Sequence, residues 1–299
     1  MSAAETAAAL GLARRSGGGW RARCPVHQSG GPSLALKDSG DGVIVHCFAG
    51  CDPRDIRVEL RRLGLLSGGS HSGRPRHPPV QTDHGDRARQ HRDFALRIWD
   101  NADRALDTPV TEYLAGRHLI LVPPPTLRYA PALKSLDGAV LPAMVAKVEH
   151  VERGFVGVHR TWICRDGAGN WVRRDRALLG PIRGGAIRLA PAAETLMVGE
   201  GIETCLAAMQ ETGRPAWAAL STSGLIRLVL PPEVRVVIIL ADNDRNGAGE
   251  RAAYKAGRRW LAEGRRVRIA IAPIPGTDMN NVLAGPLSAQ AEEGRDAAP

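Results

Sequence analysis

The chain has 299 residues, 43% of them hydrophobic, and its 40 Lys and Arg against 31 Asp and Glu give a formal net charge of +9. No apolar run approaches the roughly 18 residues of a membrane-spanning helix, and no signal peptide is present, so we expect a cytoplasmic protein that has no membrane partner. The basic surplus is nearly all arginine, which suits phosphate contacts and base stacking; a GC-rich genome would enrich arginine as well.

Two pairs of potential metal ligands lie near the N-terminus, on either side of two short segments, 33–38 and 43–47, that meet at a Ser-Gly-Asp-Gly turn. The two segments predict a β-hairpin. Closely spaced Cys and His pairs around a hairpin are typical of a structural zinc ribbon, in which Zn²⁺ supplies folding free energy that a small core lacks. The predicted zinc ligands are Cys24, His27, Cys47 and Cys51. His46 is an alternative to Cys51. We favour Cys51, because four soft or borderline donors then complete a tetrahedron.

The zinc-ribbon domain is expected to span residues 1–66, with a short Ala-rich helix at its start and a second helix over 52–66. Arg21 and Arg23 flank the first ligand pair and are candidate contacts with nucleic-acid phosphates. Residues 67–87 are rich in Gly, Ser, Pro and His and offer almost nothing to bury, which predicts a flexible linker.

Residues 88–189 mix helical and strand patterns and predict an α+β region. The expected helices start at about 88 and cover 111–119, and the expected strands cover 143–150, 154–164 and 169–180. Four basic residues here are candidate contacts with DNA or with a nucleoside triphosphate: Lys147, Arg160, Arg173 and Arg174. Polar residues on the wet side of an antiparallel sheet give the same pattern, so both interpretations stay open.

From about residue 190, short apolar runs rich in β-branched residues alternate with helical segments. This alternation predicts a right-handed parallel α/β sheet. The predicted strands lie at 195–199, 234–241 and 267–273, and 217–224 is expected to be a strand that runs into a tight turn. Helices are expected before Gly213 and over roughly 248–263. The fold class is therefore α/β, with this domain over 190–285 and a disordered tail over 286–299.

Four acidic residues follow the strands of this domain: Glu200, Asp242, Asp244 and Asp278. Ligands of a doubly wound sheet bind beyond the carboxyl ends of its strands, and carboxylates gathered there repel one another unless a divalent cation lies between them. The pattern predicts a Mg²⁺ (or Mn²⁺) site that handles phosphates; acids in the loops of an ordinary α/β domain are the alternative. We expect Glu203, one turn into the next helix, to be a solvated carboxylate at a helix start, with a supporting role at the metal as the alternative.

Three motifs in this domain resemble those of the Toprim domain, namely VGEG (198–201), LADND (240–244) and GTDMNN (276–281). The Toprim fold is shared by bacterial-type primases, type IA and type II topoisomerases and some nucleases. The resemblance implies that Glu200 is a catalytic general acid/base or a metal carboxylate. It also implies that Asp242 and Asp244 are catalytic ligands of Mg²⁺, with Asp278 as a further ligand.

The N-terminal motifs CPVH (24–27), PSL (32–34) and HCFAGC (46–51) resemble the zinc-binding domain at the head of primases from bacteria, phages and mobile genetic elements. YLAGR, LPAMVA and GVHRTW resemble the region before Toprim in phage and plasmid primase-like proteins. Together these resemblances imply a primase. Such an enzyme makes short RNA primers from nucleoside triphosphates on single-stranded DNA, by Mg²⁺-dependent nucleotidyl transfer, and its zinc module helps to hold the template.

The sequence has no P-loop motif, so we expect the replicative helicase to be a separate polypeptide. Two other functions remain open. A Toprim nuclease would use the same carboxylates to cut DNA, and the zinc ribbon counts against it. A nucleic-acid-binding replication accessory protein would carry an inactive Toprim domain, and the intact Glu200, Asp242 and Asp244 count against that.

Overall fold

The structure is a computed structural model, and it describes residues 1–26, 31–40, 42–48, 51–66, 84–241 and 247–271. The chain divides into two compact units, Met1–Val80 and Gln81–Pro299. Of the predicted linker, residues 67–83 lie outside the described residues and residues 84–87 are helical; the predicted tail, 286–299, lies wholly outside them. None of the helices in the described ranges is both long and apolar enough to cross a membrane.

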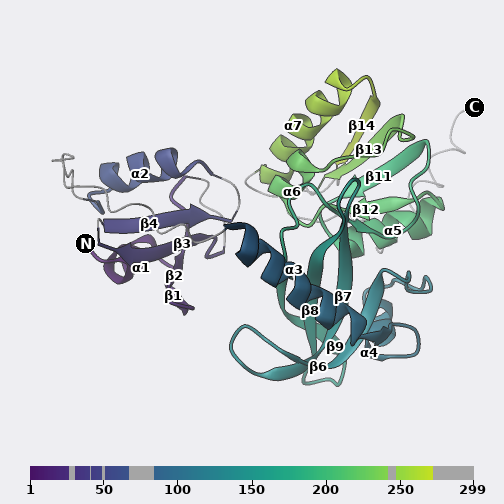
Figure 1. The fold of residues 1–299 in the computed structure, drawn as a ribbon, viewed down its shortest axis with the longest axis horizontal. Coiled ribbons are helices and arrows are strands. Elements are labelled where there is room, and N and C mark those ends of the chain that lie inside the picture. The colour runs from purple at the N-terminus through teal and green to yellow at the C-terminus, as the bar shows by residue number, and fades with distance from the viewer. Residues whose placement is uncertain (27–30, 41, 49–50, 67–83, 242–246, 272–299) are drawn as a thin grey trace, which may run out of the picture. The chain divides into compact units, whose positions relative to one another are not determined.

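The N-terminal unit is a four-stranded antiparallel sheet in the order β1-β2-β3-β4, with two helices packed on it (Figure 1). Its elements are α1 (Ala3–Leu10), β1 (Arg14–Ser16), β2 (Gly19–Ala22), β3 (Leu34–Ser39), β4 (Gly42–Cys47) and α2 (Pro53–Arg62). The strand β4 alternates, so that Val43, Val45 and Cys47 point into a core shared with both helices and the residues between them point outward. Ser2 caps α1 and Asp52 caps α2 through their side chains, which fixes where the helices begin.

The first half of the C-terminal unit is a five-stranded antiparallel sheet in the order β5-β6-β7-β8-β9. Its elements are α3 (His84–Asp100), β5 (Asp103–Arg104), α4 (Pro109–Ala115), β6 (Leu127–Lys134), β7 (Val140–His150), β8 (Gly154–Arg165) and β9 (Trp171–Leu179). On one face of this sheet, α3 packs Ile98 and Trp99 against Val145 and Val158. The other face of this sheet packs in a second core cluster, together with α4 and with the helix Ile202–Thr212 of the second half of the unit.

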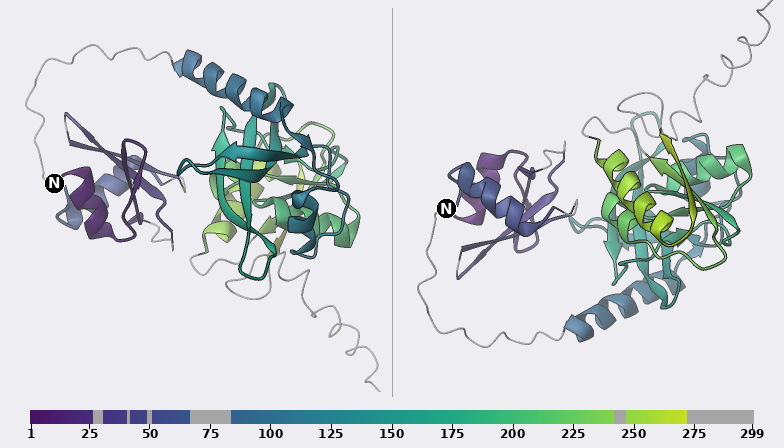
Figure 2. Two further views of the ribbon diagram at one scale, coloured as in Figure 1. Left: turned by 90° about the horizontal axis from the view of Figure 1, so that it is seen from below. Right: turned by 90° about the horizontal axis from the view of Figure 1, so that it is seen from above.

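The second half of the C-terminal unit is the predicted parallel α/β sheet. Its elements are β10 (Ile187–Arg188), β11 (Thr195–Gly199), α5 (Ile202–Thr212), β12 (Ala216–Ala218), α6 (Thr222–Arg227), β13 (Val236–Ala241), α7 (Ala248–Ala262) and β14 (Arg266–Ile271). The order is β10-β12-β11-β13-β14, with only β10 antiparallel. Helix α5 packs on one face, and α6 and α7 pack on the other (Figures 1 and 2). The predicted α/β fold class is confirmed.

The segment 217–224, predicted as a strand that runs into a tight turn, has a short strand and then a turn that enters a helix. Only Ala216–Ala218 pairs in the sheet, and α6 starts at Thr222. The reason is a side-chain cap, because the Ser221 hydroxyl accepts a hydrogen bond from the Gly224 amide at 3.0 Å. A Cβ atom at Gly224 would collide with the Ala219 carbonyl oxygen, so this turn requires glycine.

Candidate metal centres and nucleic-acid interface

Three of the four predicted zinc ligands converge in the N-terminal unit. The Sγ atoms of Cys24, Cys47 and Cys51 all lie within 4.8 Å of one another. Two sulfurs bound to one tetrahedral zinc ion lie ~3.8 Å apart, so a small contraction would bring these three sulfurs to coordinating distance of one ion. The fourth predicted ligand, His27, lies outside the described residues. This cysteine cluster is consistent with a zinc ribbon.

The three sulfurs of the cysteine cluster are donors that suit Zn²⁺. Burial, together with the neighbouring Cys47 thiol, raises the pKa of Cys51 to about 11. A divalent ion reverses that preference, because a coordinating thiol loses its proton. His46, the alternative ligand, lies in the outward-facing row of β4 and pairs with Ala35. The structure therefore brings Cys51, and not His46, to the other two sulfurs.

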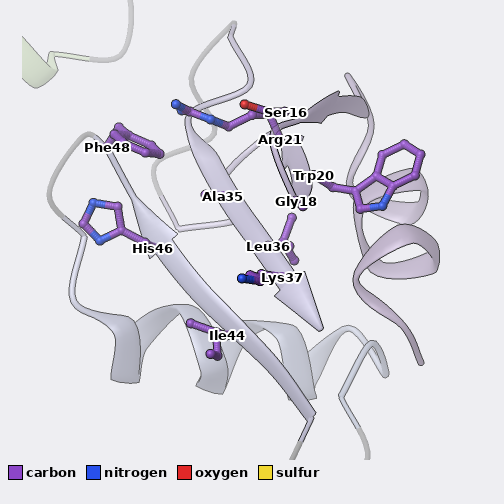
Figure 3. A pocket seen from close by; sticks show the side chains of 11 residues that line it. Ser16, Gly18, Trp20, Arg21, Ala35, Leu36, Lys37, Ile44, His46 and Phe48 are labelled. Carbon is purple, nitrogen blue, oxygen red and sulfur yellow. The ribbon is translucent and has the colours of Figure 1, made fainter. Parts of the chain in front are cut away.

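The outward-facing side of the N-terminal sheet forms a shallow pocket (Figure 3). Arg21, Ala35 and His46 lie in one row across β2, β3 and β4. Lys37 and Ile44 form the next row, and Ile44 is 52% exposed. We call this surface, which ends at Phe48, the outer face.

Aromatic and cationic side chains meet on the outer face. The Arg21 guanidinium lies 3.6 Å from the centroid of the Phe48 ring, and the His46 ring meets that ring edge-on at 4.8 Å. Phe48 is 49% exposed. Exposed rings beside cations are the features with which proteins hold single-stranded nucleic acid, because bases stack on the rings and cations follow the phosphates. Of the two predicted contacts, Arg21 lies in this surface and Arg23 is exposed just beyond β2.

Glu200 directly follows β11, the strand at which the order of strand addition in the parallel sheet reverses. The chain adds β12 on one side of β11 and then β13 on the other. Such a switch point opens a crevice at the carboxyl ends of the strands, where ligands of α/β sheets bind. Gly199 pairs with Leu240, so β11 and β13 end at the same edge, directly before Glu200 and Asp242. We call this the carboxylate edge.

Only part of the predicted magnesium site can be placed. Asp242, Asp244 and Asp278 lie outside the described residues. Glu200 is half-buried, and its carbonyl oxygen accepts a hydrogen bond from the Leu220 amide at 2.9 Å. This bond ties the main chain after β11 to the segment after β12.

Glu203 is not the solvated carboxylate that we expected. Its side chain is only 13% exposed, and its Oε1 accepts a hydrogen bond of 2.6 Å from the Tyr113 hydroxyl. Arg173 Nη1 lies 3.8 Å from the same oxygen. Burial alone would raise the pKa of Glu203, but the Tyr113 hydrogen bond, a main-chain hydrogen bond and the charges of Arg173 and Arg117 outweigh it and lower the pKa. Tyr113 belongs to α4, so the sequence near Glu203 gives no sign of this contact.

The structure separates the four predicted basic contacts of the antiparallel sheet. Lys147 and Arg160 pair with Val158 and Val145, which places both on the face covered by α3. Lys147 is ion-paired with Glu149 at 3.1 Å. Arg174 is ion-paired with Asp137 at 2.7 Å, and only Arg173 reaches Glu203.

A β-bulge determines which arginines of β9 share a face of the sheet. Trp162 pairs with Asp175 and Ile163 pairs with Arg173, so Arg174 is an extra residue in β9. The bulge shifts the alternation of side chains. As a result, Arg173 and Arg176 lie on one face, where the buried His159 also points; burial lowers the pKa of His159 to about 4.

Two family models match the C-terminal unit. Residues 195–288 match the Toprim domain, and residues 89–189 match a domain of unknown function (DUF7146). The first match confirms the Toprim resemblance, and its range includes all four predicted carboxylates. No curated protein matches the chain.

Several solved structures are similar to the chain. A primase of Aquifex aeolicus, solved with its zinc-binding and RNA polymerase domains, is 16% identical, with 98% of this chain and 82% of that chain covered at a TM-score of 0.44. A DNA primase domain from Pseudomonas aeruginosa is 17% identical, with 70% and 79% covered at 0.41. The primase fragment of the bacteriophage T7 primase-helicase protein is 20% identical, with 50% and 65% covered at 0.33.

Proposed function

We propose that this chain is a DNA primase-like nucleotidyltransferase, which joins nucleoside triphosphates into short RNA primers on a single-stranded DNA template. The observation that carries the proposal is a Toprim domain over residues 195–288 on a chain that also gathers Cys24, Cys47 and Cys51 within 4.8 Å. Each feature alone is compatible with several nucleic-acid enzymes. Together they favour a primase, because its zinc module and its Toprim domain act on one template.

In this proposal the carboxylate edge is the catalytic centre. Glu200, Asp242 and Asp244 act as the catalytic carboxylates, with Asp278 as a further metal ligand. The donor set suits Mg²⁺ or Mn²⁺, which prefer carboxylate oxygens. A bound ion would compensate the charge that develops on the transferred phosphoryl group. The chain contributes positioning, and the support for that role is the half-buried Glu200, whose main chain is tied to Leu220 at the switch point.

The N-terminal unit is proposed to bind one Zn²⁺ and to hold the template. Cys24, His27, Cys47 and Cys51 would complete a tetrahedral site whose role is structural. Template bases would stack on Phe48, and Arg21 and Arg23 would contact the phosphates. Support comes from the exposed Phe48 ring with the Arg21 guanidinium 3.6 Å from its centroid.

The basic residues of the antiparallel sheet are proposed to serve two purposes. Arg173 is the candidate contact for a nucleoside triphosphate, because it lies beside the first turn of α5, close to the carboxylate edge. Lys147, Arg160 and Arg174 lie away from Glu203, and we propose them as contacts with the DNA backbone.

Primer synthesis on single-stranded DNA of mixed sequence tests the proposal. The intact chain is given labelled nucleoside triphosphates with Mg²⁺ or Mn²⁺, beside an Asp242→Ala variant. Short products that disappear in the variant support a primase. DNA cutting without synthesis would indicate a Toprim nuclease, and tight binding without either reaction would indicate an accessory protein.

A further inference from the structure

The helix that follows Glu200 begins without a side-chain cap. Gly201 occupies the N-cap position of α5 and has no side chain with which to accept a capping hydrogen bond. Capping side chains hold the first turn of a helix and the residue that enters it. The main chain of Glu200 is held by the Leu220 amide, and the orientation of the first turn that follows depends on further contacts.

The first turn of α5 is held from a distant part of the chain. The Tyr113 hydroxyl donates a hydrogen bond of 2.6 Å to Glu203 Oε1, across 90 residues of sequence. Tyr113 is 1% exposed and sits in a core cluster with residues of both α4 and α5. Burial raises the pKa of Tyr113, which keeps the hydroxyl protonated and able to donate. A buried hydrogen bond to a carboxylate is among the stronger ones in proteins.

The charge of Glu203 is already compensated by its neighbours. Arg173 Nη1 lies 3.8 Å from Oε1, and the charges of Arg173 and Arg117 both act to lower the pKa of the carboxyl. A carboxylate held in this way by a tyrosine and an arginine is engaged inside the unit. Such a carboxylate is suited to fixing a helix in place. A metal ligand, in contrast, would direct its oxygens at the ion.

We propose that Tyr113 is a positioning residue for the carboxylate edge: by binding Glu203 it fixes the first turn of α5, and thereby the orientation of Glu200 toward a divalent metal. The inference rests on the metal site of the proposed function. It gives the region matched at 89–189, which has no assigned role, a part in building the centre of the Toprim domain.

Direct metal binding tests the inference, with Mn²⁺ as the probe and electron paramagnetic resonance of the intact chain as the readout. Tyr113→Phe keeps the buried ring and removes only the hydroxyl. Loss of a group bonded directly to a metal ligand typically weakens metal affinity about 10- to 100-fold. Tyr113 acts one contact further away, through Glu203, so we expect a loss at the low end of that range, about tenfold, for Tyr113→Phe. Tyr129→Phe, which alters a partly buried tyrosine of β6, is the matched control and should bind like the wild type. Equal binding by Tyr113→Phe would overturn the inference.

Two further variants separate a positioning role from direct ligation. Glu203→Gln keeps an oxygen that accepts from Tyr113, so its Mn²⁺ affinity should stay within about threefold of wild type, whereas Glu203→Ala should lose as much as Tyr113→Phe. If Glu203→Gln loses as much affinity as Glu200→Gln, Glu203 is itself a ligand and the positioning role is wrong. If wild type and Glu200→Gln bind Mn²⁺ equally, the proposed metal site fails first, and that result is distinct from a failure of Tyr113 alone.

Discussion

The cysteine cluster and the carboxylate edge assemble their ligands by different means. The cluster draws three thiols from the ends of short elements in a unit with four strands and two short helices. The edge is the end of a sheet covered on both faces by separate core clusters. A small core gains much of its stability from a bound metal, whereas a sheet packed on both faces is stable before any ligand binds. We therefore expect a metal that is structural at the first site and chemical at the second.

Loss of the zinc site should give the largest effect. Structural Zn²⁺ contributes roughly 10–16 kcal/mol of apparent binding free energy in small zinc modules, so Cys47→Ser should unfold the N-terminal unit. The C-terminal unit should keep its melting temperature. Zinc content together with limited proteolysis measures both, and Cys164→Ser, at a half-buried cysteine of β8, is the control. A zinc-free protein with a native N-terminal unit would show that the metal at the cysteine cluster is not structural.

Substitution at the carboxylate edge should abolish activity and leave both units folded. Glu200→Gln removes a charge that the proposed metal requires, so primer synthesis should fall about 10³-fold, or ~4 kcal/mol in the activation free energy. The melting temperatures of both units should stay unchanged, because the sheet is packed without the metal. Glu211→Gln, at an exposed position of the same helix α5, should leave the rate unaffected. Unfolding of Glu200→Gln would mean that the edge, too, is a structural site.

His159, a buried histidine of β8, should make the stability of the C-terminal unit decrease at acidic pH. Burial lowers the pKa of His159 to about 4 from 6.5, so the folded state holds it neutral. Below pH 6.5 the unfolded chain binds a proton that the folded chain does not, and stability present at neutral pH is lost as the pH falls toward 4. The loss is about 3 kcal/mol, at 1.36 kcal/mol per pKa unit.

Denaturant unfolding of the wild type and of His159→Gln between pH 7 and pH 4 measures this effect. The wild type should lose about 3 kcal/mol more than the variant over that range. Parallel losses in the two proteins would show that His159 does not set the pH dependence.

The outer face should give the smallest effect. A base stacked on an aromatic ring contributes about 1–3 kcal/mol, so Phe48→Ala should weaken binding of single-stranded DNA roughly tenfold. Phe94 on α3 is exposed to nearly the same extent, 48% against 49%, so Phe94→Ala is the matched control.

Salt dependence separates the two parts of the outer face. Arg21→Gln removes one proposed phosphate contact, so the slope of log affinity against log salt should fall by about 0.7 for a single strand. Phe48→Ala should leave the slope unchanged. Fluorescence anisotropy with a labelled oligonucleotide measures affinity and slope together, and binding that ignores salt would show that the basic residues contact no phosphates.

Local patterns revealed the positions of ligands but not the contacts that hold them. Cys24, Cys47 and Cys51 could be predicted because their spacing is local and a hairpin joins them. The carboxylate edge could be predicted because parallel strands end in register, as Gly199 and Leu240 do. Glu203 was misjudged, because its partner lies 90 residues away on α4, and a helix-start carboxylate gives no sign of such a partner.

The arrangement of arginines in β9 could not be predicted for a different reason. A strict two-residue alternation would place Arg173 and Arg176 on opposite faces. The bulge at Arg174 puts them on the same face, and a single extra residue leaves no mark in composition or periodicity. Phe48 was not singled out from the sequence, because whether its ring is buried or exposed depends on the register of β4, which places it at the border of the outer face.

Template-directed synthesis at the carboxylate edge is what the proposed function requires. The most direct measurement is to sequence the products that the intact, zinc-loaded chain makes on a defined single-stranded DNA template with Mg²⁺, beside Glu200→Gln. We expect short RNA complementary to the template from the wild type and none from the variant. Products that are unrelated to the template, or that persist in Glu200→Gln, would contradict it.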